Sequence, residues 1–266
     1  MGWGPEPIWS TARVIENTVA CKSETCVSIA LEVPEETVQE YVVPGQYVQV
    51  RLNEDTQPLF LAISSPPVGN STSPEADTTT TTGPSSATTF EFLVKKTDNN
   101  DWMTAAQAGT SMEISQVLGN GFPMEEELEG FKYDFPTQNI LLFAAGSGIA
   151  PIKAAVESGQ LDLSKGGLGG RTARLYYGVR DSDDLCFMDK FLEWEEAGVE
   201  VVPVLSQPGD DWKGRAGYVQ NALEEDGVPI PRNSGALLCG MKGMAESVKD
   251  ILTKAGVMEG RVLTNF

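Results

Sequence analysis

Apolar and polar residues alternate in short segments along the first half of the chain, a pattern typical of β-strands. These segments are rich in β-branched and aromatic residues, and turn residues such as Pro44-Gly45 and Gly109 separate them. We expect strands at residues 12–18, 27–33, 47–52, 60–64, 90–95 and 111–115. Short strands at this spacing, with little helical periodicity between them, predict a small antiparallel barrel or sandwich.

After Pro136 the pattern changes to apolar strands that alternate with amphipathic helices. We expect strands at 139–144, 174–178, 199–205, 235–239 and 261–265, and helices at 150–158, 187–197, 217–225 and 241–255. This alternation predicts right-handed βαβ units and a parallel sheet covered by helices on both faces. The chain is therefore expected to have two domains: a β-barrel at 1–136 and an α/β domain at 137–266.

Residues 69–89 interrupt the barrel pattern. This segment holds 12 Ser or Thr among 21 residues and has no aromatic or basic side chain. Such a segment buries too little apolar surface to offset the entropy of ordering it. We therefore expect a disordered insertion between two strands.

Composition and charge exclude several classes of function. Hydrophobic residues make up 41% and charged residues 21% of the 266, and the apolar runs are too short for a transmembrane segment. The formal net charge of -19 would repel a phosphate backbone, so no nucleic-acid partner is expected. Most of the acidity belongs to residues 1–136, which carry 6 basic and 20 acidic side chains.

Histidine is absent, which removes Ser-His and Cys-His nucleophile pairs, HExxH zinc sites and a histidine general base. The four cysteines, Cys21, Cys26, Cys186 and Cys239, show neither a CxxC pair nor paired metal-ligand spacing. We therefore expect reduced, unlinked thiols in a reducing compartment and no metal site. The first residues, MGWGPEPIWS, show no targeting peptide.

A glycine-rich turn follows the first strand of the expected parallel sheet. The motif Gly146-Ser147-Gly148-Ile149-Ala150-Pro151 has the spacing G-x-G-x-x-P at the start of a helix. Glycines let the backbone approach a diphosphate, whose charge is met by free N–H groups and by the positive end of the helix. The alternative is a tight turn between strand and helix with no ligand.

Further motifs stand at the ends of the later strands, where open parallel sheets bind their ligands. They are Tyr176-Tyr177-Gly178-Val179-Arg180, Val204-Leu205-Ser206-Gln207, Leu237-Leu238-Cys239-Gly240-Met241 and Leu263-Thr264-Asn265-Phe266. In type, order and spacing these motifs resemble those of the ferredoxin-NADP reductase superfamily. The chain is most similar to its plant and algal plastid branch, the fruit-protein-like FAD/NAD(P)-binding oxidoreductases.

The resemblance implies a role for each strand end. Gly146, Ser147, Gly148 and Ile149 would hold the diphosphate of NADP or NAD. Arg180 and Ser206 would lie near the adenosine ribose, and Tyr218 would stack on adenine. Cys239, Gly240 and Met241 would lie beside the nicotinamide, and Phe266 beside the flavin face that nicotinamide must reach. The catalytic candidates are Cys239 and Phe266. The alternatives are a buried strand-end thiol for Cys239 and simple core packing for Phe266. For Arg180 the alternative is a cap or a salt bridge with the acidic residues that follow it, Asp181, Asp183 and Asp184.

The flavin half departs from the family pattern R-x-Y-S. Alignment on Ser65-Pro66-Pro67 places Leu59, Leu61 and Ala62 at the signature arginine, tyrosine and serine. Backbone groups of Leu61, Ala62, Ile63 and Ser64 would remain as contacts to FAD. The second flavin element also lacks its glycines, and the remaining phosphate contacts there are Lys95, Lys96 and Thr104.

Two functions are consistent with these observations. The first is a flavin-dependent NAD(P)H oxidoreductase that transfers hydride between the nicotinamide and FAD. The second is a non-catalytic accessory subunit or nucleotide-binding protein of a larger plastid complex that has lost the flavin. The resemblance implies a chloroplast location, and the acidic barrel predicts that ferredoxin is not a partner.

Overall fold

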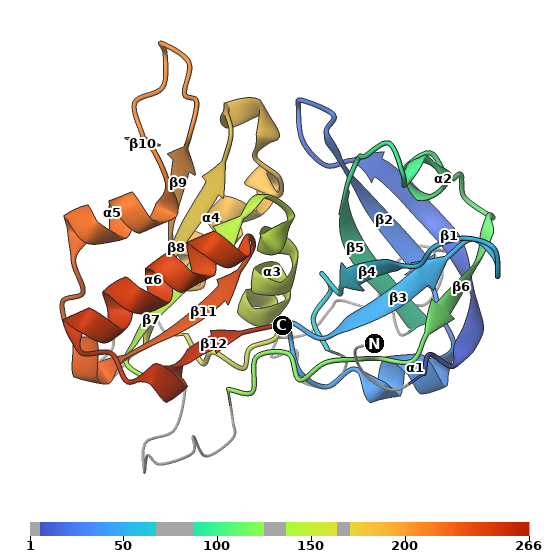
Figure 1. Ribbon diagram of the computed structural model, residues 1–266, viewed down its shortest axis with the longest axis horizontal. Helices are drawn as coiled ribbons and strands as arrows, with labels where there is room; N and C mark the ends of the chain where they lie inside the picture. Colours follow the sequence, from blue (N-terminus) through green and yellow to red (C-terminus); the bar gives the residue numbers. More distant parts are fainter. Residues whose placement is uncertain (1–5, 68–87, 125–136, 164–170, 266) are drawn as a thin grey trace.

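The computed structural model describes residues 6–67, 88–124, 137–163 and 171–265, which form two six-stranded sheets (Figure 1). The first sheet is antiparallel, with the order β4-β3-β6-β1-β2-β5. Its strands are β1 (Trp9–Val19), β2 (Cys26–Glu32), β3 (Tyr47–Arg51), β4 (Leu59–Ala62), β5 (Thr89–Lys95) and β6 (Ser111–Ser115). The Ser64 N–H donates to the Glu91 carbonyl at 2.8 Å beside the free edges, so the sheet is a nearly closed barrel.

Each of the six strands expected in this half is present. Alternate side chains point inward, as Ile29 and Leu31 do on β2 and Val48 and Val50 on β3, and all four are fully buried. Two helices were not expected, α1 (Glu35–Glu40) and α2 (Asp101–Thr104). Both are too short to produce a detectable helical period in the sequence.

The second sheet is parallel, with the order β10-β9-β8-β7-β11-β12. Its strands are β7 (Asn139–Ala145), β8 (Thr172–Val179), β9 (Val199–Leu205), β10 (Arg215–Ala216), β11 (Ser234–Cys239) and β12 (Val262–Thr264). The chain runs outward from β7 to β10 and then returns to the other side of β7 as β11. The strand order therefore reverses between β7 and β11, the kind of position at which open α/β sheets bind ligands.

Helices cover both faces of the parallel sheet. On one face lie α3 (Ile149–Glu157) and α4 (Phe191–Glu196), packed on Ile140 and Leu142 of β7. On the other face lie α5 (Val219–Asp226) and α6 (Lys242–Ala255), packed on Leu141 and Phe143. These helices and strands confirm the expected doubly covered sheet.

Two local expectations in this half need correction. The helix expected at 187–197 is shorter, because a single 3-10 turn at Met188–Lys190 precedes α4. Phe187 adopts a left-handed backbone with φ of 57°, which a continuous α-helix does not allow. The helix expected at 217–225 begins two residues later, after the short strand β10.

The two halves meet along α3, which lies between the parallel sheet and the barrel (Figure 1). The core layer under α3 includes barrel residues, among them Cys21, Leu93 and Phe122. The domain boundary at 136 and most of the expected insertion, residues 69–87, lie outside the described residues and stay predictions. Thr89, at the end of that insertion, is the first residue of β5. In the described part of the chain, no helix has the length and apolarity needed to cross a membrane.

Candidate functional site

The glycine turn forms a single 3-10 turn, Gly146–Gly148, that leads from β7 directly into α3. Gly146 and Ser147 are exposed, whereas Gly148 and Ile149 are buried. The first N–H groups of a helix have no partner within the helix, so they can meet a phosphate. The exposed half of the turn therefore has the geometry expected of a diphosphate site.

Gly146 and Gly148 are constrained differently. Gly146 has φ of 55°, and a Cβ built there meets nothing within 4 Å. A Cβ at Gly148 would lie 2.4 Å from the carbonyl oxygen of Cys239 and 2.9 Å from the Gly240 nitrogen. Gly148 thus lets the start of α3 pack against the end of β11. A substitution there would disturb this packing as well as any ligand.

The other predicted nucleotide contacts lie along the same, carboxyl edge of the sheet. Arg180 follows β8 and Ser206 follows β9, and backbone bonds join the two strand ends: Ser206 N–H donates to Val179 O at 3.0 Å. The exposed guanidinium of Arg180 donates through Nε to Gln207 Oε1 at 2.9 Å. Tyr218, 55% exposed, follows β10 and precedes α5. The fold brings these residues to one edge, and their ligand roles stay predictions.

The end of β11 lies next to the glycine turn. Cys239 is 9% exposed, and burial raises the pKa of its thiol to about 12. Gly240 has φ of 146°, and a Cβ there would lie 2.8 Å from the Ala145 Cβ, while Met241 is 66% exposed. At neutral pH Cys239 is a thiol and not a thiolate, so it can pack or donate a hydrogen bond but is a poor nucleophile.

Asn265 follows β12 and contacts the barrel. Its Nδ2 donates to the Gly45 carbonyl oxygen at 3.4 Å. Its Oδ1 is buried and has no hydrogen-bond partner among the described residues. The Asn265 side chain also hydrogen-bonds to Cys239, which lowers the pKa of that thiol against the larger effect of burial. Phe266, the next residue, lies outside the described residues.

On the barrel side, β4 is an edge strand, and the segment that follows it contacts Lys153 of α3 through the Ser64 carbonyl. Leu61 is half-buried and packs on the barrel core, and Ala62 is half-buried. Ile63 and Ser64 are buried, and their N–H groups donate to Gln46 O at 3.1 Å and to Glu91 O at 2.8 Å. These two N–H groups are used within the barrel, which leaves Leu61 and Ala62 as the more accessible of the predicted flavin contacts.

The predicted phosphate contacts on the barrel lie on both sides of α2: Lys95 and Lys96 precede it, and Thr104 is its last residue. Lys95 is exposed, but Thr104 is buried and its hydroxyl donates to the Asn100 carbonyl at 3.3 Å. The Asn100 side chain is hydrogen-bonded within the loop that precedes α2: its Oδ1 accepts from the Thr97 N–H, and its Nδ2 donates to the Lys95 carbonyl. Asp101 adds a carboxylate to the first turn of α2. The surroundings of α2 are therefore a less favourable site for a diphosphate than the glycine turn, because their polar groups are already hydrogen-bonded and a carboxylate lies beside them.

Lys153 of α3 joins the two halves of the site. Its ammonium group is buried and contacts Glu157 Oε2 at 2.8 Å, Glu91 Oε2 at 3.1 Å and the Ser64 carbonyl at 3.3 Å. Glu91 and Ser64 belong to the barrel seam, where β5 lies beside the glycine turn. A single cation on the helix after the glycine turn thus holds the seam in place.

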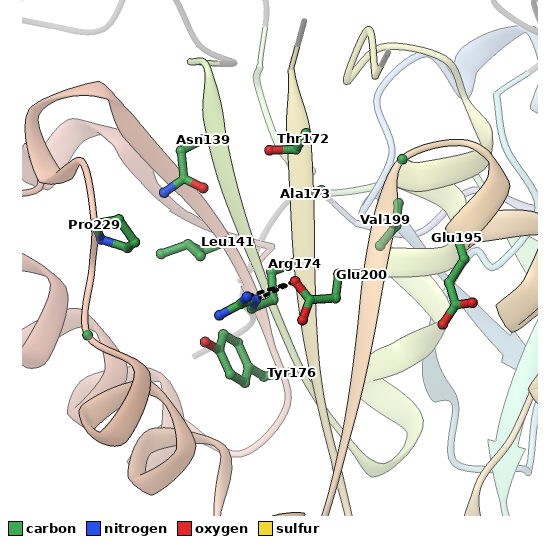
Figure 2. Close-up of a pocket in the computed structure, with 12 residues that line it drawn as sticks. Asn139, Leu141, Thr172, Ala173, Arg174, Tyr176, Glu195, Val199, Glu200 and Pro229 are labelled. Atoms are coloured by element: carbon green, nitrogen blue, oxygen red, sulfur yellow. Dashed lines mark hydrogen bonds and ion pairs between the residues drawn. The ribbon is translucent and has the colours of Figure 1, made fainter. Parts of the chain in front are cut away.

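A hollow of about 500 Å³ lies at the opposite, amino edge of the parallel sheet (Figure 2). Arg174 and Glu200 point toward each other across it and pair at 2.8 Å. Arg174 also pairs with Asp226 at 3.3 Å, and Tyr176 Oη donates to the same carboxylate at 2.9 Å. Because these charges satisfy one another, we assign them a structural role and place the candidate site at the carboxyl edge.

Three of the cysteines form a group that was not expected from the sequence. Cys21 and Cys26 of the barrel meet Cys186 of the α/β domain, and all three are buried. A hydrogen bond from the Cys186 thiol lowers the pKa of Cys26 to about 7, and the same bond together with burial raises the pKa of Cys186. Cys21 and Cys26 stand at a C-x4-C spacing that metal ligands can have, but Cys186 is remote from them along the chain. Only the packing of the two domains therefore brings the third thiol to the pair.

Comparisons with known proteins agree with this geometry. Residues 142–250 match the family model described as the oxidoreductase NAD-binding domain. Over 98% of its length the chain is 31% identical to the fruit protein pKIWI502 of Actinidia deliciosa, and the match covers 76% of that protein. The NADH-cytochrome b5 reductase-like protein of Arabidopsis thaliana is 26% identical over 60% of this chain and 46% of its own length.

A solved structure has the same two-domain architecture. The ferredoxin NADP+ reductase from Neisseria gonorrhoeae with bound FAD and NADP superposes with a TM-score of 0.72 at 16% identity, covering 97% of this chain and 98% of that one. At this identity the likeness concerns the fold. Taken with the match to the fruit protein over both domains, it shows that the chain belongs to the ferredoxin-NADP reductase superfamily, in the family of fruit-protein-like FAD/NAD(P)-binding oxidoreductases.

Proposed function

We propose that this protein is an NAD(P)H-dependent flavin oxidoreductase that transfers hydride between the nicotinamide and a flavin. The observation that carries the proposal is the position of the glycine turn. It lies at the point where the strand order reverses and, at the same time, beside β5 at the barrel seam. A nucleotide held by this turn lies next to the barrel surface on which the superfamily holds its flavin.

The carboxyl edge supplies the nucleotide contacts. The exposed backbone of Gly146 and Ser147 binds the diphosphate, and Arg180 with Ser206 binds the adenosine ribose, where a 2'-phosphate would pair with the guanidinium. Tyr218 offers its exposed ring to adenine. Cys239 and Asn265, close to the glycine turn at the end of β11, would supply hydrogen bonds to the nicotinamide carboxamide.

The barrel surface suits the isoalloxazine ring of a flavin better than it suits the flavin's diphosphate. Leu61 and Ala62 provide a partly exposed apolar surface near the seam, and a flat apolar contact suits the isoalloxazine ring. For the diphosphate, Lys95 and Lys96 are the exposed cations next to α2. A bound flavin would supply the hydride-accepting chemistry, while the protein holds the two rings in register and keeps water away.

A second function, a nucleotide-binding accessory subunit without flavin, is favoured by one observation. The N–H groups of Ile63 and Ser64 and the side chain of Asn100 are used within the barrel, in the two segments where the superfamily binds flavin. In that case the nucleotide edge would act as a sensor or a structural ligand site. The notion of a larger plastid complex rests on the resemblance alone and is part of this second proposal.

The visible spectrum of the purified protein separates the two functions. Flavin absorption that is bleached by NADPH or NADH under anaerobic conditions is the result expected for the enzyme. A colourless, folded protein that binds NADPH, but takes up no flavin when incubated with FAD, would contradict the enzyme and support the accessory subunit. A chloroplast location, also proposed from the resemblance, is tested by following a fluorescent fusion of the protein in living cells.

A further inference from the structure

Three of the four cysteines meet between the hairpin that joins β1 to β2 and the loop after β8, which face each other in Figure 1. The Ser23 N–H of the hairpin donates to the Asp183 carbonyl of the loop at 2.8 Å. The Sγ atoms of Cys21, Cys26 and Cys186 all lie within 4.8 Å of one another. The three residues are 6%, 7% and 1% exposed, and all are free thiols. Two sulfurs thus come from the barrel and the third from the α/β domain.

Hydrogen bonds hold the hairpin and the loop together around the sulfurs. Cys21 Sγ lies 3.3 Å from Ser23 Oγ and 3.5 Å from Thr25 Oγ1. Both hydroxyls donate to Asp184 Oδ1, at 2.5 and 3.0 Å, across the domain boundary. Within the hairpin, the Ala20 N–H donates to the Cys26 carbonyl at 3.0 Å. A carboxylate and two hydroxyls next to a set of ligand atoms are the kind of outer partners that orient metal ligands.

We propose that Cys21, Cys26 and Cys186 bind a thiophilic metal ion of the Zn²⁺ class, which ties the barrel to the α/β domain. Three sulfurs favour Zn²⁺ and other soft or borderline ions over Mg²⁺ or Ca²⁺, which prefer oxygen. Zn–S bonds of about 2.3 Å place tetrahedral sulfurs roughly 3.8 Å apart, so the sulfurs have only to draw together by about 1 Å. Each thiol that binds releases its proton to solvent, and a water molecule completes the tetrahedron.

A disulfide is the competing use of these thiols, and the arrangement favours the metal. One disulfide would join two of the sulfurs and leave the third buried without a role. A metal uses all three. None of its residues is among those assigned to the nucleotide, and its test measures metal binding, so the test does not depend on the proposed reaction.

The test is metal titration of the complete protein, stripped of metal and reduced with a phosphine. Addition of Co²⁺ should produce a thiolate-to-metal charge-transfer band that saturates at one equivalent per chain, and Zn²⁺ should displace it. Cys186→Ser should weaken Zn²⁺ binding by at least about 100-fold in competition with a chromophoric chelator, since even the loss of an outer partner costs up to that much. Cys239→Ser is the matched control, because Cys239 is also buried but lies outside the group, and its Zn²⁺ binding should be unchanged.

Absence of saturable binding by the reduced wild-type protein would overturn the proposal, as would an unchanged affinity in Cys186→Ser. If that variant fails to fold, alkylation of the wild-type protein in mild denaturant, mapped by mass spectrometry, decides the question. Zn²⁺ should protect Cys21, Cys26 and Cys186 together and leave Cys239 unprotected. Equal labelling with and without Zn²⁺, or a disulfide between two of the three cysteines in protein purified without reductant, would contradict a metal site.

Discussion

Gly146 and Gly148 stand two residues apart in one turn, yet they are glycines for different physical reasons. Gly148 is required by the packing of α3 on the end of β11, where a Cβ would lie 2.4 Å from a backbone oxygen. Gly146 is exposed, has φ of 55° and faces open space. Asn and Asp tolerate this left-handed backbone better than other side chains do. Gly146 is therefore the position at which ligand binding can be tested without disturbing the core.

We expect Gly146→Asp to weaken NADPH binding by at least about tenfold, because its carboxylate would lie against the phosphates. Gly146→Asn has nearly the same size and backbone preference without the charge, so it should bind several-fold more tightly than Gly146→Asp. Fluorescence titration with NADPH measures both, and circular dichroism checks that both variants are folded. Equal affinities for the two variants would place the diphosphate elsewhere.

Cys239 links the site to the pH dependence of stability. Its pKa is about 12 in the folded protein against 9.0 for an unperturbed thiol. The Cys239 thiol therefore stays protonated to a higher pH in the folded state than in the unfolded state. The free energy of unfolding has its full value below about pH 9 and decreases as the pH rises toward 12. We expect the free energy of unfolding of the wild-type protein to fall above about pH 9 more steeply than that of Cys239→Ala, by about 1.4 kcal/mol per pH unit.

Urea unfolding at about pH 8 and about pH 10 measures this difference. Buried tyrosines such as Tyr41, whose pKa is also raised by burial, act in the same direction in both proteins and cancel in the comparison. If the free energy of unfolding fell equally with pH in the two proteins, the pKa of Cys239 would be the same in the folded and unfolded states, which would contradict the prediction.

At the scale of the elements, α3 connects the glycine turn to the barrel. Its Lys153 is buried against two carboxylates and the Ser64 carbonyl, and Glu157 is itself only 17% exposed at the side chain. Removal of the cation leaves that carboxylate with the Trp194 indole N–H as a donor, at 3.1 Å, but without a counter-charge in a poorly solvated place. This costs far more than an exposed ion pair contributes. The seam between β4, β5 and α3 therefore depends on this side chain.

We expect Lys153→Met to lower the free energy of unfolding by about 2 kcal/mol or more. Lys254→Met is the matched control: Lys254 also pairs with a carboxylate on its own helix, Asp250, but the two side chains are 74% and 59% exposed. Its loss should cost less than about 0.5 kcal/mol. Urea denaturation measures both, and a Lys153→Met protein as stable as the control would show that the seam does not need the cation.

At the scale of the whole molecule, charge is distributed unevenly. Residues 1–136 carry 6 basic and 20 acidic side chains. Two of those basic groups are already paired in the described structure: Arg51 with Glu113 at 2.6 Å and Lys22 with Asp183 at 2.8 Å. The long-range field of the barrel is therefore negative, and it repels an acidic protein partner most strongly at low salt.

We expect no productive docking of an acidic ferredoxin, whether or not a flavin is bound. Binding is measured by isothermal calorimetry at low and at moderate ionic strength, and no heat of association is expected at either. Micromolar affinity that weakens with added salt would contradict this prediction and would indicate that Lys95 and Lys96 form a local basic surface strong enough to outweigh the net charge.

The sequence alone determined the two sheets and the order of the strand-end motifs. Those features follow from local periods of about 2 and 3.6 residues and from turn residues, which neighbouring positions specify. The predicted strands of the barrel, the glycine turn after β7 and the row from Arg180 to Gly240 are all of this kind. The resemblance to the superfamily, now supported by the match to the fruit protein, depended on the same local motifs.

Tertiary structure decided the rest, because the deciding contacts join residues that are far apart in the chain. The sequence does not reveal that Gly148 faces the backbone of Cys239, that Lys153 reaches Ser64 and Glu91, or that the Ile63 N–H is already used by the barrel. The three thiols are the clearest case. Cys21 and Cys26 show no metal-ligand spacing with Cys186, and only the docking of a barrel hairpin on a loop of the α/β domain places their sulfurs together.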